Sequence, residues 1–268
     1  MMLTRGKNLI YFTLFNNLEY LSMLKMCLNT ILKNCIKPEF DMLFITEKIF
    51  VEEISNTIKE FKGNVYFNTD YTAENSVKAS MNKLKIYNFV NIQNYEKILF
   101  LDCDVFVMNN LNLIFGEEWN PEKLCVFNNP DVPVYSYNSK FHGLKVIPDE
   151  KLAELYHEGV LPFNAGHFAF VNTSKMKKHF TNVIWLAESW PGEYFYEQSF
   201  MNHYFALNKI VDYTVFKEKI FLVNLLKGMV DYKAFYDKCI VHFIGDVVSP
   251  EKKLKKIQEY YNATFPLL

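Results

Sequence analysis

The chain has 268 residues, half of them hydrophobic, and its 25 Phe and 17 Tyr supply enough apolar material for the core of an α/β enzyme. The formal net charge is -1, from 29 basic and 30 acidic residues. This balance gives no long-range field that attracts nucleic acid or anionic lipid, so a phosphate-bearing ligand would need a local site.

The five cysteines are scattered and have no CxxC spacing. We therefore expect neither a disulfide framework nor a zinc ribbon, and we expect a cytoplasmic or other reducing compartment. We recognise no signal peptide, and no uncharged apolar run reaches the ~20 residues that cross a bilayer. Without an evident repeat, low-complexity tract or linker, the simplest organisation is one domain over residues 1–268.

The first half of the chain alternates short apolar runs with amphipathic segments. Asn16 or Asn17 is placed to cap the first helix, whose apolar positions recur at the spacing of one helical face. Strands that alternate with helices favour right-handed βαβ units and a mostly parallel sheet. The pattern predicts strands at 9–15, 42–46, 65–67 and within 97–108, and helices from Asn16 or Asn17 to Pro38, at 51–61 and at 76–88.

The second half is less regular. Residues 128–163 hold most of the turn-forming residues, and we expect them to lie over an active site. Ser249, Pro250 and Glu251 have the order of an N-cap, a first helical residue and an acid near the positive end of a helix. The pattern predicts strands at 124–127, 167–171 and 241–244, and helices at 174–189, at 197–207 and after Ser249.

The most informative segment is Asp102-Cys103-Asp104, which follows a continuously apolar strand, Ile98 to Leu101. Such a strand is typical of the buried centre of a parallel sheet, and ligands of open α/β folds bind where its strands end. Residues two apart in an extended chain point the same way, so Asp102 and Asp104 can converge. Carboxylate oxygens suit Mg²⁺ or Mn²⁺. The alternative is a pair of acids in a solvated turn.

Four further segments place polar side chains at expected strand or helix ends. His242, with Gly245 after it, is either a core histidine or a ligand beside a backbone that another molecule can approach closely. Glu197 and Gln198 open an apolar helix, either as an acid favoured at that helix end or as a carboxylate and an amide beside a reacting carbon. The other two are Phe163-Asn164-Ala165-Gly166, also compatible with a simple turn, and Thr13–Tyr20, where a helix N-terminus and an aromatic ring can receive a nucleotide.

Taken in this order, over about residues 9–256, the segments resemble the motifs of the family 8 retaining glycosyltransferases. The resemblance implies a GT-A type α/β fold, with a Rossmann-like, mostly parallel central sheet flanked by helices. Asp102-Cys103-Asp104 matches the metal-binding Asp-x-Asp, and His242-Phe243-Ile244-Gly245 matches the start of His-Phe-x-Gly-x-x-Lys-Pro-Trp. The other matches are Thr13–Tyr20 with Thr-Leu-x-x-Asn-x-x-Tyr, Asn82-Lys83-Leu84 with Ala/Thr-Arg/Lys-Leu, Phe163–Gly166 with Phe-Asn-Ser/Ala-Gly, and Glu197-Gln198 with Asp-Gln.

The resemblance also implies site residues. Asp102, Asp104 and His242 would hold Mn²⁺, or Mg²⁺ in its place, and Gln198, Glu197 and Asp104 would have catalytic roles. Tyr20 would stack on uracil in a uridine pocket. The residues expected to bind the UDP-sugar donor are Leu14, Asn16, Asn17, Tyr20, Lys83, Asp102, Cys103, Asp104, Asn164, Ala165, Gly166, His242, Gly245 and Lys252.

The sequence departs from the family pattern at two motifs. Val248 stands where the family has its diphosphate-binding lysine, and Ser249-Pro250 replaces Pro-Trp. Lys252 or Lys253 is the candidate replacement, from the start of the terminal helix. Glu197 stands for an aspartate and lengthens that side chain by a methylene group.

The expected function is therefore a retaining, Mn²⁺-dependent transfer of a hexose from a UDP-sugar to a hydroxyl group. The sugar would be glucose or galactose, or N-acetylglucosamine, and the acceptor a glycan, a protein side chain or a polyol. Two alternatives are a nucleotidyltransferase on a similar sheet and an inactive module that binds nucleotide sugars. The expected partners are thus small molecules and the acceptor, with no nucleic acid and no transmembrane segment, and a homodimer is a possible assembly.

Overall fold

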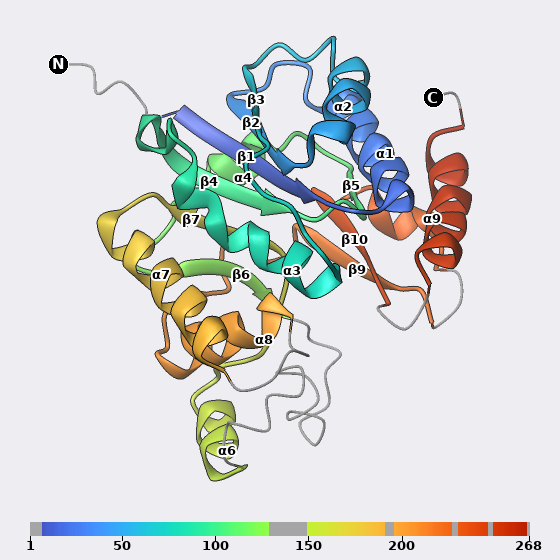
Figure 1. Ribbon diagram of the computed structural model, residues 1–268. Coiled ribbons are helices and arrows are strands. Elements are labelled where there is room, and N and C mark those ends of the chain that lie inside the picture. The colour runs from blue at the N-terminus through green and yellow to red at the C-terminus, as the bar shows by residue number, and fades with distance from the viewer. Residues whose placement is uncertain (1–6, 129–148, 191–195, 227–229, 246–248, 267–268) are drawn as a thin grey trace, which may run out of the picture.

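The computed structural model of the protein describes residues 7–128, 149–190, 196–226, 230–245 and 249–266. The strands of its larger sheet are β1 (Lys7–Leu14), β2 (Phe40–Thr46), β3 (Val65–Asn68), β4 (Tyr95–Leu101), β6 (Leu124–Asn128), β7 (Phe163–Val171) and β8 (Val211–Asp212). Their order is β3-β2-β1-β4-β7-β6-β8 (Figure 1). β7 runs antiparallel to β4 and β6, while the other paired strands of this sheet run parallel.

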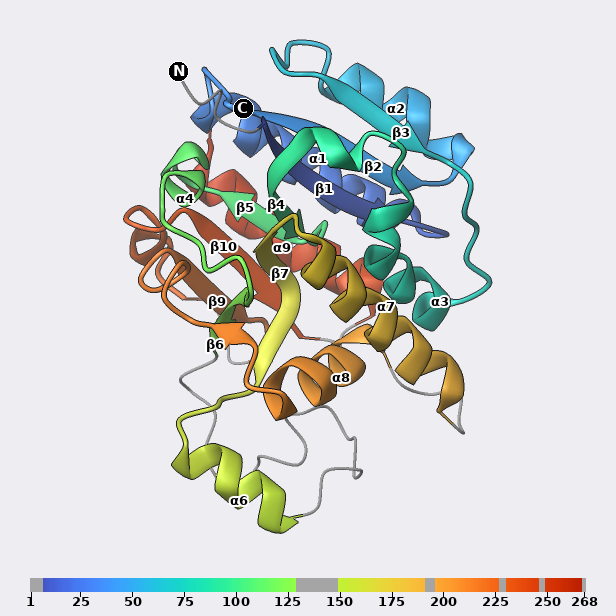
Figure 2. The ribbon, with the colours of Figure 1, turned by 90° about the vertical axis from the view of Figure 1, so that its left-hand side faces the viewer.

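Helices cover both faces of this sheet (Figures 1 and 2). The described α-helices are α1 (Leu18–Asn34), α2 (Val51–Thr57), α3 (Ser76–Met81), α4 (Asn112–Phe115), α6 (Asp149–His157), α7 (Ser174–Ser189), α8 (Glu197–Met201) and α9 (Pro250–Thr264). Side chains alternate along β1, so Ile10 and Phe12 pack in one core cluster with α1 and α2. Leu9 and Tyr11 pack in the opposite cluster with α7 and α8. Burial on both faces explains why the central strands are continuously apolar.

A second, smaller sheet consists of β5 (Val105–Val107), β10 (Ile240–Ile244) and β9 (Ile220–Asn224), in the order β5-β10-β9. It packs against α9, where Phe243 lies 5.3 Å from Tyr260 between ring centroids. β5 follows β4 after a short turn, and β10 pairs antiparallel with β5. This pairing places β10, and with it His242, close to the carboxyl end of β4.

Most elements predicted from the sequence are present, with shifted ends. Asn17 is the N-cap of α1, and its side chain accepts a hydrogen bond from the Tyr20 N–H. Ser249 takes the N-cap position of α9, with Pro250 as the first helical residue. The predicted helix at 174–189 is α7 with the same bounds. The fold class predicted from the sequence, a mostly parallel sheet flanked by helices, is confirmed.

Several predicted bounds are wrong. The helix expected at 51–61 ends at Thr57, and the one expected at 76–88 continues from Asn82 as a 3-10 helix. The strand expected to start at His167 starts at Phe163, because Phe163 already pairs with Asn128 of β6. The helix expected at 197–207 changes to a π-helix at Asn202.

The region predicted to be irregular, 128–163, falls largely outside the described residues. Its last part contains α6, which the turn-forming residues did not indicate. Strands β8 and β9 were also not predicted: β8 has only two residues, whereas β9 has the apolar sequence of a strand and was missed. In the described part of the chain, every helix is too short or too polar to span a bilayer.

Candidate active site

A cleft of about 1180 Å³ opens at the carboxyl ends of β1 and β4. The N-terminus of α1 lies at one part of it, and the segment from Ala73 to Lys83 at another. Residues Asp102 to Asp104 and His242 lie between these parts. A cleft at the strand ends, where the chain leaves β1 and β4, is the position in which open α/β sheets bind ligands.

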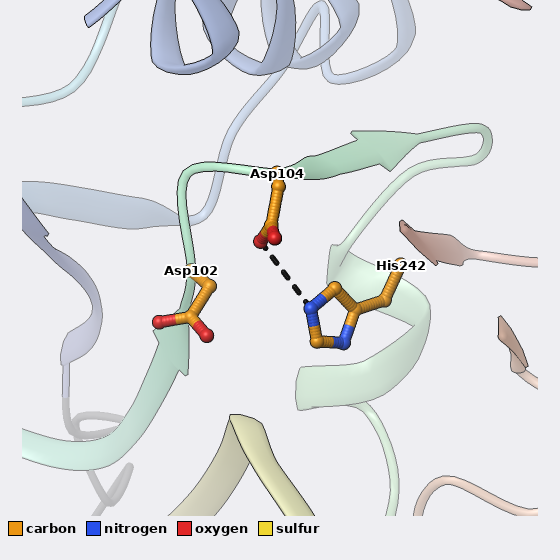
Figure 3. Close-up of side chains that lie close together, drawn as sticks. All are labelled: Asp102, Asp104 and His242. Atoms are coloured by element: carbon orange, nitrogen blue, oxygen red, sulfur yellow. Dashed lines mark ion pairs between the residues drawn. The ribbon is translucent and has the colours of Figure 1, made fainter. Parts of the chain in front are cut away.

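Asp102, Asp104 and His242 converge in this cleft (Figure 3). One oxygen or nitrogen atom from each of the three lies within 4.8 Å of the others. His242 reaches this place because β10 pairs with β5, and the Phe243 N–H donates to the Asp104 carbonyl at 3.0 Å. Two carboxylates and an imidazole form a ligand set that suits Mn²⁺ or Mg²⁺. Oδ1 of Asp104, which faces Nε2 of His242, is buried without a hydrogen-bond partner, which fits a site that binds a cation.

Because Gly166 has no side chain, it leaves space for the side chains of His242 and Asp102. A Cβ atom on Gly166 would lie 2.3 Å from Cε1 of His242 and 2.7 Å from Oδ2 of Asp102. The neighbouring backbone is fixed as well, since the Asp102 N–H donates to the Gly166 carbonyl at 2.7 Å. A side chain at this position would therefore displace two of the three candidate ligands.

Lys83 joins the candidate metal site to Glu197. Its Nζ lies 3.1 Å from Oδ1 of Asp102 and 2.6 Å from Oε1 of Glu197, and the side chains of Lys83 and Glu197 are both buried. Burial alone would lower the pKa of Lys83, but the two carboxylates raise this pKa above its ordinary value. Lys83 therefore stays charged, and it compensates carboxylates that would otherwise be costly to bury.

Asp104 is paired with a lysine from the terminal helix. The Lys253 ammonium contacts Oδ2 of Asp104, while Nε2 of His242 lies 3.3 Å from Oδ1. Burial would raise the pKa of Asp104, but Lys253 and His242 together hold this pKa well below its usual range. Lys253 is buried and lines the cleft, whereas Lys252 is exposed and lies outside it. Val248, the position of the family lysine, lies outside the described residues.

The segment from β1 to α1 forms another wall of the cleft. Asn16 has a φ of 54°, a conformation that asparagine tolerates better than most residues, and its N–H donates to the Glu47 carboxylate at 3.0 Å. Tyr20 lies in the first turn of α1 and lines the cleft. Burial raises the pKa of Tyr20 to about 12, so its phenol remains neutral. The N-terminus of α1 is suited to an anionic or hydrogen-bonding ligand.

The side chain of Gln198 is oriented by β7. Its Oε1 accepts a hydrogen bond from the Ala165 N–H at 2.9 Å, so the amide NH₂ group is its free donor end. One helical turn later, Asn202 donates to the Phe163 carbonyl and accepts from the Phe163 N–H, both at 2.9 Å. The amide side chains of Gln198 and Asn202 thus attach α8 and the residue after it to backbone groups of β7.

Most residues expected from the sequence line the cleft, and two do not. Ala165 is fully buried, because it alternates with Asn164 and Gly166 along β7, and it contacts the site through its backbone only. Lys252 lies outside, as described above. Those that line the cleft are Leu14, Asn16, Asn17, Tyr20, Lys83, Asp102, Cys103, Asp104, Asn164, Gly166, Glu197, Gln198, His242 and Gly245.

Sequence reasoning missed several residues of the site, among them Tyr196, Ser76 and Asn202. Tyr196 and Ser76 line the cleft, and their hydroxyl oxygens lie 3.2 Å apart. Asn202 lies behind Gln198 and is fully buried. The spacing of four between Gln198 and Asn202 places both on one helical face, which is the signal that could have identified Asn202. Ser76 and Tyr196 are 120 residues apart, and nothing in the sequence joins them.

The fold is that of known glycosyltransferases. The bifunctional glycosyltransferase WbbM matches 98% of this chain at 13% identity, with a TM-score of 0.62, and this chain spans 52% of the length of WbbM. Galactosyltransferase LgtC, solved with donor and acceptor sugar analogues, matches 96% of this chain and 95% of its own at 14% identity and a TM-score of 0.61. Mouse xyloside xylosyltransferase 1 matches 90% of this chain and 97% of its own at 15% identity and 0.53.

These similarities establish a GT-A type fold, as the sequence resemblance implied. No protein-family model matches the sequence, and a comparison with curated proteins gave no match.

Proposed function

We propose that this protein is a metal-dependent, retaining hexosyltransferase of the family 8 type, which uses a UDP-sugar. The observation that carries the proposal is the convergence of Asp102, Asp104 and His242 in a cleft that Lys83 and Lys253 also face. Four carboxylates line the cleft, those of Glu74, Asp102, Asp104 and Glu197, against the two ammonium groups of Lys83 and Lys253, so the cleft has an excess of negative charge. This excess favours a divalent cation, and the cation in turn favours a diphosphate.

Each part of the cleft then has a role. Asn16, Asn17 and Tyr20, at the N-terminus of α1, bind the uridine. Asp102, Asp104 and His242 hold Mn²⁺, which when bound neutralises negative charge on the diphosphate. Lys253, in the first turn of α9, faces the oxygens of the same diphosphate. The sugar lies toward Asn164, Gly166 and Gln198.

In the transfer, the acceptor hydroxyl oxygen forms a bond to the anomeric carbon, and the bond from this carbon to the diphosphate breaks. The bonding electron pair leaves with UDP, and the hydroxyl proton passes to the departing diphosphate oxygen. The anomeric carbon gains positive character during this step. The NH₂ group of Gln198 donates to the sugar or the acceptor, and Glu197 keeps Lys83 in place beside Asp102. Attack from the face that the diphosphate leaves gives net retention.

Thermal unfolding with nucleotides tests the binding part of this proposal. We expect UDP to raise the melting temperature in the presence of Mn²⁺ and much less after chelation, with ATP and GTP giving smaller shifts. Stabilisation by ATP or GTP instead would favour a nucleotidyltransferase.

A screen of UDP-sugars for hydrolysis tests the catalytic part. We expect Mn²⁺-dependent release of UDP from UDP-glucose or UDP-galactose, and a loss of about two orders of magnitude in Asp102→Ala. UDP binding without release from any UDP-sugar would identify a nucleotide-sugar-binding module and contradict the enzyme assignment.

A further inference from the structure

Tyr196 is an exposed aromatic side chain that lines the cleft. It is the N-cap residue of α8, directly before Glu197 and Gln198, and half of its surface (50%) is open to solvent. Its hydroxyl lies 3.2 Å from the Ser76 hydroxyl at the start of α3. This contact holds the ring at its far end. An aromatic ring held with an open surface in a binding cleft is suited to pack against a ligand.

Contacts between neighbouring side chains give the order of groups along the cleft. Tyr20 belongs to α1, which packs in the core cluster on one face of the large sheet, and Asp104 lies beside His242 and Asp102. Asp102 pairs with Lys83, and Lys83 pairs with Glu197, which directly precedes Gln198 and follows Tyr196. Tyr196 begins α8, which packs in the core cluster on the opposite face of the sheet, so Tyr20 and Tyr196 reach the candidate metal site from helices on opposite faces. If the nucleotide lies against Tyr20, Tyr196 lies beyond the sugar, where an acceptor must approach.

We propose that Tyr196 is a stacking platform for a carbohydrate acceptor, so that the hydroxyl to be modified belongs to a sugar ring. This inference rests on the proposed function and names the substrate class of that site. A pyranose has an apolar face of C–H groups that covers an aromatic ring, and hydroxyl groups at its edge. Glu74 and Ser80, from the same segment as Ser76, also line the cleft and offer polar groups to such hydroxyls. The cleft volume of about 1180 Å³ leaves room for a sugar besides the donor.

The experiment uses the full chain, a UDP-sugar that it hydrolyses, and a panel of acceptors. The panel contains methyl glucosides, methyl galactosides, lactose and maltose, with glycerol and N-acetyltyrosinamide as non-carbohydrate hydroxyl compounds. We expect one or more saccharides to accelerate UDP release above hydrolysis. For that saccharide, Tyr196→Ala raises KM about tenfold, while the Kd of UDP with Mn²⁺ changes by less than about twofold. Tyr196→Phe, which keeps the ring, raises KM far less.

The matched control is Tyr236→Ala, since Tyr236 is similarly exposed, at 54%, but lies outside the cleft. It should leave both constants unchanged. The inference is wrong if hydrolysis proceeds but only glycerol or the tyrosine derivative accelerates it, or if no compound does. It is equally wrong if Tyr196→Ala weakens UDP as much as the saccharide, because the ring would then hold the donor. Failure of the wild-type protein to bind UDP would instead contradict the proposed function itself.

Discussion

The Nζ of Lys83 lies 2.6 Å from a carboxylate oxygen of Glu197, and both side chains are buried. Because the same Nζ lies 3.1 Å from Asp102, one ammonium group links the N-terminus of α8 to the end of β4. The side chain that matches the family aspartate is thus engaged with Lys83. Gln198, the next residue, is the one whose NH₂ group faces the cleft.

The first prediction concerns this buried ion pair. Lys83→Met leaves two carboxylates without their counter-charge, so the free energy of unfolding should fall by about 3–5 kcal/mol. Urea denaturation measures the change. In Lys83→Met combined with Glu197→Gln, one of the two carboxylates is removed and part of the stability should return. An unchanged urea midpoint for Lys83→Met would show that the pair contributes nothing to stability.

The second prediction separates two adjacent lysines. Lys253 is buried against Asp104, while Lys252 is exposed outside the cleft. Lys253→Met should weaken UDP binding in the presence of Mn²⁺ by at least about tenfold, whereas Lys252→Met should change it by less than about twofold. Isothermal titration with UDP measures both. A larger effect of Lys252→Met would return the diphosphate role to that residue.

The third prediction uses the space beside Gly166. In Gly166→Ala the new methyl group would meet His242 and Asp102 at 2.3 and 2.7 Å, so both must move. Because a displacement of this size disturbs the candidate ligands, UDP-sugar hydrolysis should fall by about 10²-fold. The Mn²⁺-dependent part of the thermal shift should fall with it.

The control for this change is Gly116→Ala, at the end of α4, where the Cβ would meet only backbone oxygens at 3.3 Å or more. This variant should hydrolyse the UDP-sugar at the wild-type rate. Full activity and metal dependence in Gly166→Ala would contradict the arrangement in Figure 3.

The fourth prediction assigns a positioning role to Asn202. Asn202→Ala leaves the buried N–H and carbonyl of Phe163 without their side-chain partner, at a cost of about 1–3 kcal/mol for each group. Because α8 is then less firmly attached to β7, Gln198 is misplaced, and kcat for hydrolysis should fall more than UDP affinity. Asn208→Ala, whose amide bonds only within its own helical segment, should change neither. Equal losses in kcat and UDP affinity would argue against positioning.

Some of these features follow from local sequence and others from distant pairings. The helix that begins after Asn17 and the strand before Asp102 were predictable, since capping and burial act over a few residues. The early start of β7 was not, because it depends on Asn128, which lies 35 residues before Phe163 in the chain, as a partner. Lys252 and Lys253 both lie in the first turn of α9. Which of them lies in the cleft depends on which face of that helix packs inward, and this was not predictable from the sequence.

Periodicity and motif spacing are local properties, so the alternation of strands and helices and the candidate metal ligands were predictable from the sequence. Which side chains meet depends on the tertiary structure. It placed His242 beside Asp104 through the pairing of β10 with β5, put Lys253 rather than Lys252 in the cleft, and brought Tyr196 to Ser76. Contacts between residues more than a hundred positions apart depend on how the sheets and helices pack, and no local pattern encodes that packing.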